Sequence, residues 1–303
     1  MARTRQNGKR KIIDTIMILI LVAGLGVLSY PFVRNSLNDL INQQLIRHYQ
    51  AEANQKSKEE YQQQLEKLEE MNRQFAYQNI SPGFDPFSEE AKEIEQTKVI
   101  YEDHIIGVIS IPKIAVRLPI FDQTTEAFLA KGASYLEGTS FPIGGESTHS
   151  VLSGHRGLTE AKLFTDLPDL VKGDHFYIEL GEAEIHAYQV DDIKVVEPTD
   201  VSSLQIEKGK DYITLVTCTP YMINSHRLLV RGHRVPYVPE LMESEVKEAK
   251  VDYYTFMPIV ILGLVLFLIL IVIFRKFRRS RKSSPTRSKP KTADSNFFND
   301  ENG

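Results

Sequence analysis

The chain has 303 residues, of which 42% are hydrophobic and 25% are charged, and its formal net charge is −4 at pH 7. This balance excludes a wholly disordered or wholly membrane-embedded chain and leaves room for one sizeable domain with accessory segments. The single cysteine excludes an internal disulfide, so outside the cell its thiol would be unpaired unless it had a chemical role.

Two apolar segments have the composition of membrane-spanning helices. Residues 256–274 carry no charge and have about the length that crosses a hydrocarbon core of roughly 30 Å. Residues 13–33 follow a basic start and lack a small-residue cleavage site, which favours an uncleaved anchor over a signal peptide. Both flanking tails are basic, so the positive-inside rule predicts cytoplasmic termini and an extracellular middle.

The middle of the chain is acidic and begins with a helical pattern. An acidic surface disfavours nucleic-acid binding, and the basic tail around residues 280–291 is interpreted as a topology determinant. Residues 36–78 are predicted to be helical, with a thin apolar stripe along "YQQQLEKLEEMNRQF" that suits packing by one edge or a stalk. The prolines and glycine of "NISPGFDPFSEEA" end this helix.

From about residue 105 to residue 237 the pattern changes to that of strands. Short runs rich in Val, Ile, Tyr and Thr are separated by turns bearing Gly, Pro and Asp. We expect a mainly β fold, a barrel or a sandwich, with short helices near residues 125–130 and 159–163. The sequence has no Gly-rich phosphate loop and no Cys/His metal spacing, so no cofactor and no metal are expected.

Cys218 is the first candidate for chemistry, in "TLVTCTP" at the end of a predicted strand. A single cysteine is most often a small buried apolar residue, and the apolar run before it suits that reading. Arg227 follows on the next predicted strand, "HRLLVRG", and a neighbouring guanidinium would favour a thiolate and could hold an oxyanion. His155, in "VLSGHRG", would serve as proton donor, but spacing leaves His149, His226 and His233 as competitors.

Together, "TLVTCTP", "NSHRLLVRG" and "LSGHRG" resemble the sortases, the membrane-anchored cysteine transpeptidases of Gram-positive bacteria. The resemblance covers about residues 100–237 and implies a closed eight-stranded β-barrel. It also implies that Cys218 is the nucleophile, His155 the catalytic histidine and Arg227 the essential arginine. Some relatives have a calcium-binding loop, and the sequence leaves that point open.

The flanks resemble class C sortases, which polymerise pilins. A second membrane helix and the Asp-Pro-Phe segment (Asp85, Pro86 and Phe87) are features of that class, in which such a segment covers the active site as a lid. The aspartate would engage Arg227 and the aromatic ring would cover the cysteine. Without the resemblance, the segment would be interpreted as a turn that ends the helix.

The resemblance implies an enzyme that cleaves an LPxTG-like sorting signal through a thioacyl intermediate and passes the acyl group to a pilin lysine. Its partners would be pilin subunits bearing sorting signals and acceptor lysines, together with membrane lipid. Two alternatives remain: a housekeeping sortase that attaches surface proteins to the cell wall, and a non-enzymatic surface scaffold or signalling ectodomain.

These predictions divide the chain into seven parts. They are a cytoplasmic tail (1–12), an anchor (13–33), a helical region with a lid at about 81–90 (34–98), the catalytic barrel (99–237), a linker (238–255), a transmembrane helix (256–274) and a second cytoplasmic tail (275–303).

Overall fold

The computed structural model describes residues 37–56, 58–78, 85–87, 100–158, 161–181 and 184–248, together with isolated positions at 16, 20, 23, 24, 27, 30, 34 and 267. The chain divides into two compact units, Met1–Lys250 and Val251–Gly303. Almost all of the second unit lies outside the described residues, so the fold described below is that of the first.

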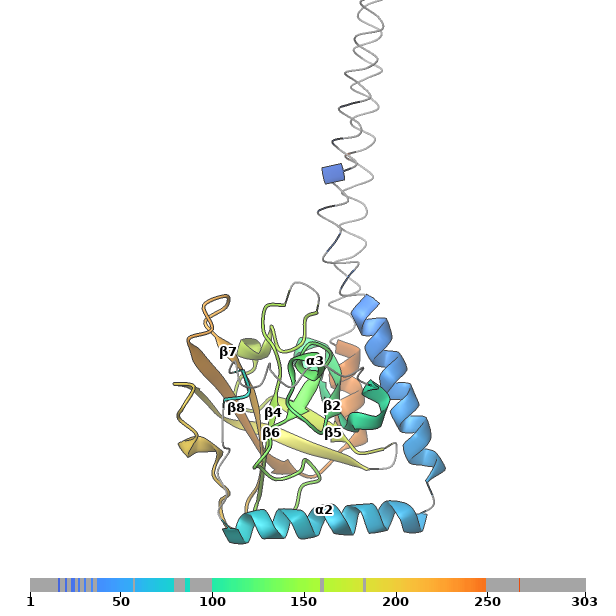
Figure 1. Ribbon diagram of the computed structural model, residues 1–303, viewed down its shortest axis with the longest axis vertical. Coiled ribbons are helices and arrows are strands. Elements are labelled where there is room, and N and C mark those ends of the chain that lie inside the picture. Colours follow the sequence, from blue (N-terminus) through green and yellow to red (C-terminus); the bar gives the residue numbers. More distant parts are fainter. Residues whose placement is uncertain are drawn as a thin grey trace, which may run out of the picture. The chain divides into compact units, whose positions relative to one another are not determined.

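Eight strands close into a barrel in the order β1-β2-β3-β4-β7-β8-β6-β5 (Figure 1). Most neighbours are antiparallel, whereas β2 pairs with β3 and β4 with β7 in parallel. The closed eight-stranded barrel that the resemblance implies is therefore confirmed, and the alternative of a sandwich is wrong. The strands are β1 Ile105–Ile111, β2 Val116–Phe121, β3 Ala133–Tyr135, β4 Thr148–Ser153, β5 His175–Glu179, β6 Ile185–Val196, β7 Asp211–Thr219 and β8 His226–Val235.

Apolar side chains from all parts of the barrel fill its interior. The main core cluster includes Ile109, Leu152, Phe176, Leu215 and Val230, each of which is almost fully buried. Several strands, among them β1 and β4, are buried on nearly every residue because helices and loops also cover their outer face. The sequence pattern missed β3, whose three residues are too few to show an alternation.

The predicted helical region forms two helices instead of one. Residues 37–55 and α2, Lys58–Gln78, run in different directions around a bend at Lys56 (Figure 1). The first helix buries Leu45 and Ile46 beside a cluster with Phe121, while Leu65 and Leu68 of α2 pack against the main core. Each helix thus packs by one edge, and the break follows from burying two apolar stripes against different parts of the barrel.

One of the two predicted short helices is present. Helix α3, Glu126–Leu129, begins after the N-cap Thr125, whose hydroxyl accepts a hydrogen bond from Phe128 N. In the segment predicted as a second helix, the described residues 161–163 are not helical, because Leu163 adopts a left-handed φ of 42°. Within the predicted linker, residues 239–248 form a helix.

Most residues of the predicted membrane segments 13–33 and 256–274, and all residues of the two predicted cytoplasmic tails, lie outside the described residues. No helix in the described part of the chain combines the length and the apolar character needed to cross a membrane.

Candidate active site

Cys218 and Arg227 lie side by side on antiparallel strands. Their Cα atoms are register partners near the C-terminal end of β7 and the N-terminal end of β8. Both residues are largely buried, with 6% and 7% of their surfaces exposed. The predicted proximity of the thiol and the guanidinium is therefore present.

The guanidinium of Arg227 is held by the backbone and by a carboxylate. Its Nη1 donates to the carbonyl oxygens of Asn224 and His226, at 2.9 and 3.0 Å. Its Nε donates to Asp85 Oδ1 at 2.8 Å, and its Nη2 pairs with the second oxygen of the same carboxylate. This two-point contact fixes the plane of the guanidinium.

The Asp-Pro-Phe segment also contacts the site through Phe87. The ring of Phe87 lies 5.2 Å from the guanidinium carbon of Arg227 and 5.5 Å from the centre of the His155 ring. Phe87 also packs against a small apolar cluster that contains Val216 and Leu229 of the two strands carrying the thiol and the guanidinium. The segment therefore contacts both predicted partners of the cysteine.

Parallel pairing of β4 with β7 positions His155. Ser153 is the register partner of Val216, so two further residues along each strand lead to His155 and Cys218. The turn is anchored because Gly154 N donates to Val216 O at 3.0 Å, and the Thr217 hydroxyl donates to Gly154 O at 2.7 Å. A side chain at position 154 would meet the ring of Phe164 at 2.5 Å, so the close approach requires glycine.

His155 has a carboxylate partner that the sequence analysis missed. Its Nε2 lies 3.1 Å from Glu126 Oε1, on helix α3. The short helix could be predicted from its N-cap Thr125. Nothing in the sequence, however, connects residue 126 with a histidine 29 positions later.

The electrostatic environment of the thiol contains opposing influences. Burial raises the pKa of Cys218, the positive charge of Arg227 lowers it, and the negative charge of Asp85 raises it again. The net pKa lies above that of an ordinary cysteine. With the Asp-Pro-Phe segment in place, the site therefore favours the protonated thiol.

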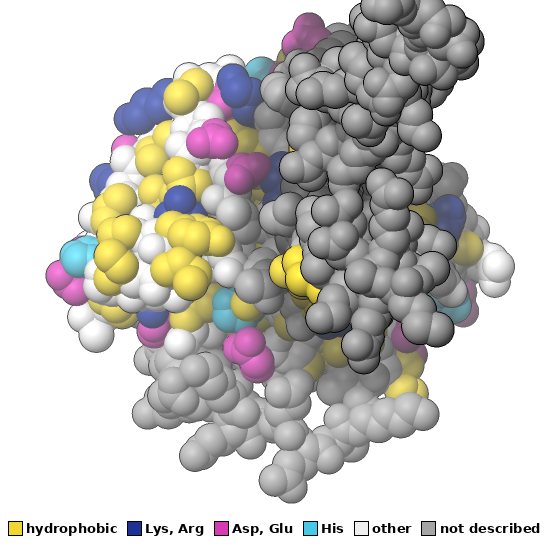
Figure 2. Space-filling view, turned by 90° about the horizontal axis from the view of Figure 1, so that it is seen from above, with side chains coloured by type: hydrophobic (Ala, Val, Ile, Leu, Met, Phe, Trp, Pro, Cys, Tyr) yellow, Lys and Arg dark blue, Asp and Glu magenta, His cyan; other side chains and the backbone are white. Residues whose placement is uncertain are grey.

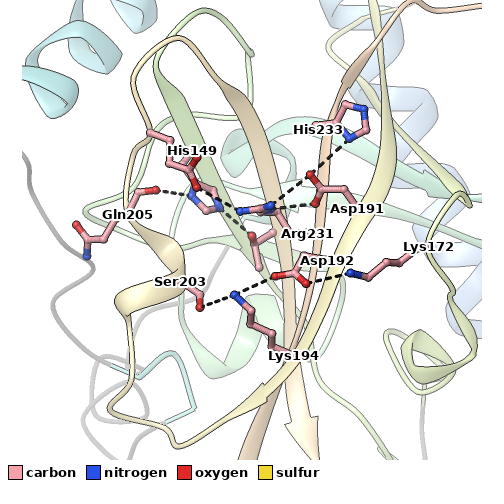
Figure 3. A network of polar contacts seen from close by, with 11 residues as sticks. His149, Lys172, Asp191, Asp192, Lys194, Ser203, Gln205, Arg231 and His233 are labelled. Atoms are coloured by element: carbon pink, nitrogen blue, oxygen red, sulfur yellow. Dashed lines mark hydrogen bonds and ion pairs between the residues drawn. The ribbon is translucent and has the colours of Figure 1, made fainter.

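The three competing histidines interact with other residues. His149 is buried between β4 and β7, where its Nδ1 lies 2.9 Å from Gln205 O and its Nε2 lies 2.8 Å from Thr214 Oγ1. Burial lowers its pKa. Figure 3 shows it beside the network of Arg231, Asp191 and His233, to which residues on β6 and β8 contribute.

His226 pairs with Glu197, at 3.2 Å, and with the Ser225 hydroxyl. In the described part of the chain, the ring of Phe87 lies against His155, so His155 is the histidine beside the Asp-Pro-Phe segment.

An apolar rim lies next to the thiol. The loop between β7 and β8 exposes Tyr221, Met222 and Ile223, and it lies at the upper end of the barrel in Figure 1. Figure 2 looks onto that end and shows apolar side chains interspersed with charged ones. Tyr221 also lies 5.7 Å from the guanidinium carbon of Arg156, which donates to Thr219 Oγ1 at 3.1 Å.

Among the described residues, no group of three or more His, Cys, Asp or Glu side chains is arranged to hold a metal ion. What the site offers chemically is a thiol, a guanidinium with several N–H donors, and an imidazole beside a carboxylate. A nucleophile, an oxyanion donor and a proton carrier are the groups that acyl transfer through sulfur requires. A closed barrel with these groups at one end is suited to acyl transfer through a cysteine.

Comparisons with known proteins agree with this class. The sortase domain model matches residues 109–235. Sortase C-1 from Streptococcus pneumoniae is 44% identical, with a TM-score of 0.56, over 65% of this chain and 100% of that one. The pilus-related sortase C of group B Streptococcus is 43% identical, with a TM-score of 0.54, over 61% and 94%. Sortase A of Bacillus anthracis is 29% identical over 75% of this chain and 96% of its own length.

The chain therefore belongs to the sortase family. As a member of this family it is an enzyme, a cysteine transpeptidase, and the alternative of a non-enzymatic scaffold is not supported.

Proposed function

We propose that the protein is a class C sortase, a membrane-anchored transpeptidase that polymerises pilins. It cleaves an LPxTG-like sorting signal through a thioacyl intermediate and joins the pilin to a lysine of the next subunit. The observation that carries the proposal is the Asp-Pro-Phe segment, with Asp85 paired to Arg227 and Phe87 packed against His155. The similarity to a structure described as a pilus-related sortase C supports it.

In the proposed mechanism, Cys218 is the nucleophile. Its thiolate attacks the threonine carbonyl of the sorting signal, and Arg227 stabilises the oxyanion that forms. His155 protonates the departing glycine amine as the C–N bond breaks, which leaves a thioester on the sulfur. The lysine amine then attacks this thioester, returns a proton to His155 and releases the thiolate.

The Asp-Pro-Phe segment acts as a lid in this proposal. The carboxylate of Asp85 occupies the guanidinium donors that the oxyanion would need, and the Phe87 ring covers the imidazole. Substrate would have to displace both side chains before reaction. Closing the site in this way limits oxidation of an extracellular thiol and excludes water.

We also propose that the protein is held in the membrane by two helices, within residues 13–33 and 256–274, with the barrel outside the cell. The arrangement rests on the apolar runs and their basic flanks. It would keep the barrel where secreted pilins emerge.

The experiment that tests the function is trapping of the acyl-enzyme. The full-length protein in detergent is incubated with an LPxTG-like peptide and examined by mass spectrometry. We expect an adduct on Cys218 with the mass of the peptide up to the threonine, and no adduct in Cys218→Ala. An adduct on another residue, or none under conditions where the peptide is cleaved, would contradict the proposal.

A housekeeping sortase is the second candidate, since the curated relatives include sortases A from Bacillus anthracis and Listeria monocytogenes. The two functions differ in the acceptor amine. Transfer of the peptide to a pilin lysine in preference to a cell-wall cross-bridge amine supports the pilin polymerase, and the opposite preference supports the housekeeping enzyme.

A further inference from the structure

We propose that Glu126 is a positioning residue for His155. By accepting a hydrogen bond from Nε2–H it fixes the tautomer and orientation of the imidazole, so that the protons exchanged during acyl transfer move on and off Nδ1. This inference rests on the proposed role of His155 as the general acid and base, and it adds a fourth side chain to the reaction.

The tautomer follows from the chemistry of the contact. His155 Nε2 lies 3.1 Å from Glu126 Oε1, with 15% of the histidine side chain and 37% of the glutamate side chain exposed. An ionised carboxylate only accepts hydrogen bonds, so Nε2 must carry the proton. In the neutral imidazole the lone pair is then on Nδ1, which is the nitrogen that can take a proton.

Glu126 is a suitable anchor because its helix is fixed on the barrel. Thr125 caps the helix, and the hydroxyl of the preceding residue, Thr124, donates to Tyr135 O at 2.7 Å. Phe128, two residues after Glu126, is buried and stacks on Phe121 of β2 with ring centres 4.7 Å apart. A carboxylate on such a support holds its partner with little loss of side-chain entropy.

His155 is also restrained from the backbone side. Gly154 and Thr217 tie the start of its turn to β7, so the imidazole can vary mainly through its own side-chain torsions. The hydrogen bond to Glu126 restricts those torsions. The Phe87 ring adds a contact on the imidazole when the lid is closed, whereas Glu126 lies outside the lid and can keep its contact after the lid opens.

The proton balance of the reaction agrees with this assignment. The thiol proton passes to Nδ1 of His155, giving a thiolate and an imidazolium whose Nε2–H remains bonded to the carboxylate. Attack by the sulfur forms the thioester, and the proton on Nδ1 leaves with the glycine amine. The incoming lysine amine returns a proton to Nδ1 as the C–S bond breaks. Glu126 keeps its charge throughout and favours the imidazolium.

Nitrogen NMR of the full-length protein with ¹⁵N-labelled histidine tests the tautomer without using activity. At a pH where His155 is neutral, we expect Nε2 of the wild type to be protonated and Nδ1 to be bare. Glu126→Ala should give a mixture of tautomers, whereas Glu126→Gln should keep the wild-type tautomer, because the amide oxygen can still accept from Nε2–H. His155→Asn identifies the signals.

The pH dependence of peptide cleavage separates positioning from packing. We expect kcat/KM to fall about 3- to 30-fold in Glu126→Ala, well short of the 10²–10⁴ associated with loss of a general acid–base group. In both variants the limb of the profile set by loss of the imidazolium proton should move to lower pH, since the favourable charge is absent. Glu137→Gln, on an exposed loop residue, is the control and should leave the profile unchanged.

The outcomes distinguish this inference from the proposed function. If the wild type forms the Cys218 adduct but Glu126→Ala retains a single Nε2–H tautomer and an unshifted profile, the positioning role is wrong and the proposed function stands. If no adduct forms on Cys218 but the tautomer depends on Glu126, the positioning is present and the assigned reaction is wrong.

Discussion

At the scale of single residues, the charge and cover around Cys218 control its reactivity. Arg227 favours the thiolate, while burial and Asp85 favour the thiol. Because the same carboxylate also pairs with the guanidinium, the proposed lid would disfavour the thiolate through its own charge and occupy the proposed oxyanion donor at the same time. Removal of the lid would therefore reverse both effects together.

We expect substitutions of Asp85 and Phe87 to change the pH profile for alkylation of Cys218 in different ways. In Asp85→Asn, loss of the negative charge should lower the pKa of Cys218, so the midpoint of the rate profile moves to lower pH. Below that midpoint, a downward shift of one unit would raise the thiolate fraction about tenfold. Phe87→Ala should act through access to the thiol, so it should raise the limiting rate at high pH, where the thiol is fully ionised. Because burial raises the pKa of Cys218, any loss of burial should also move the midpoint to lower pH.

The measurement is the alkylation rate of the full-length protein as a function of pH, with Asp39→Asn, far from the site in sequence and on the first helix, as the control for a lost carboxylate. Equal rates in the wild type and both lid variants would show that the segment is only a connector. An unshifted midpoint in Asp85→Asn would contradict the electrostatic part alone.

At the scale of elements, one buried amide connects α2 to the barrel. Asn72, with 3% of its surface exposed, accepts a hydrogen bond from Phe141 N at 2.7 Å and donates to Phe141 O at 3.2 Å. It lies within the run that carries the predicted apolar stripe. A polar residue can occupy that stripe because both of its amide atoms have backbone partners.

We expect Asn72→Ala to lower the free energy of unfolding by about 1–3 kcal/mol, since the N–H and C=O of Phe141 would lose their partners. A loss of this size corresponds to a fall in Tm of about 2–4 °C per kcal/mol in a domain of this length. Thermal unfolding followed by circular dichroism measures it. Gln74→Ala, on the exposed face of the same helix, is the matched control, and an equal Tm for the two variants would refute the role of Asn72.

At the scale of the whole molecule, the helices that precede and follow the barrel in the chain are both fixed to the barrel. On the N-terminal side, Tyr49 donates to Ile106 O at 3.1 Å, and Tyr61 donates to Glu184 at 2.7 Å. On the C-terminal side, Glu245 lies 2.9 Å from His175 Nδ1 and accepts a hydrogen bond from Tyr177 at 2.7 Å. Both flanking helices are therefore attached to the barrel through tyrosine and carboxylate side chains.

We therefore expect the contacts of Glu245 to stabilise the helix at residues 239–248. Loss of its charged hydrogen bonds, worth about 1.5–3 kcal/mol each, should speed amide hydrogen exchange in that helix by roughly tenfold or more in Glu245→Ala. Exchange in β7 and β8 should not change. Glu243→Ala, on the exposed side of the helix, is the control, and equal exchange in the two variants would show that the helix is held by other contacts.

Most of the barrel and two residues of the site could be predicted from local sequence patterns. The bounds of β7 and β8 coincide with the runs "DYITLVTCT" and "HRLLVRGHRV", because β-branched and apolar residues bounded by turns are a local signal. The same signal placed Cys218 and Arg227 on successive strands, and their proximity depended on the pairing of those strands, which the structure shows. His155 came from the resemblance, since spacing did not distinguish it from His149, His226 and His233.

The remaining contacts of the site depend on how segments far apart in the sequence pack together. Parallel pairing of β4 with β7 joins residues more than sixty positions apart, and it places His155 at the strand ends that carry Cys218. Glu126 reaches His155 from a separate helix, and the break near Lys56 directs two apolar stripes to different faces. These features depend on which surfaces meet in space, and hydrophobic periodicity reports only which residues share a face of their own element.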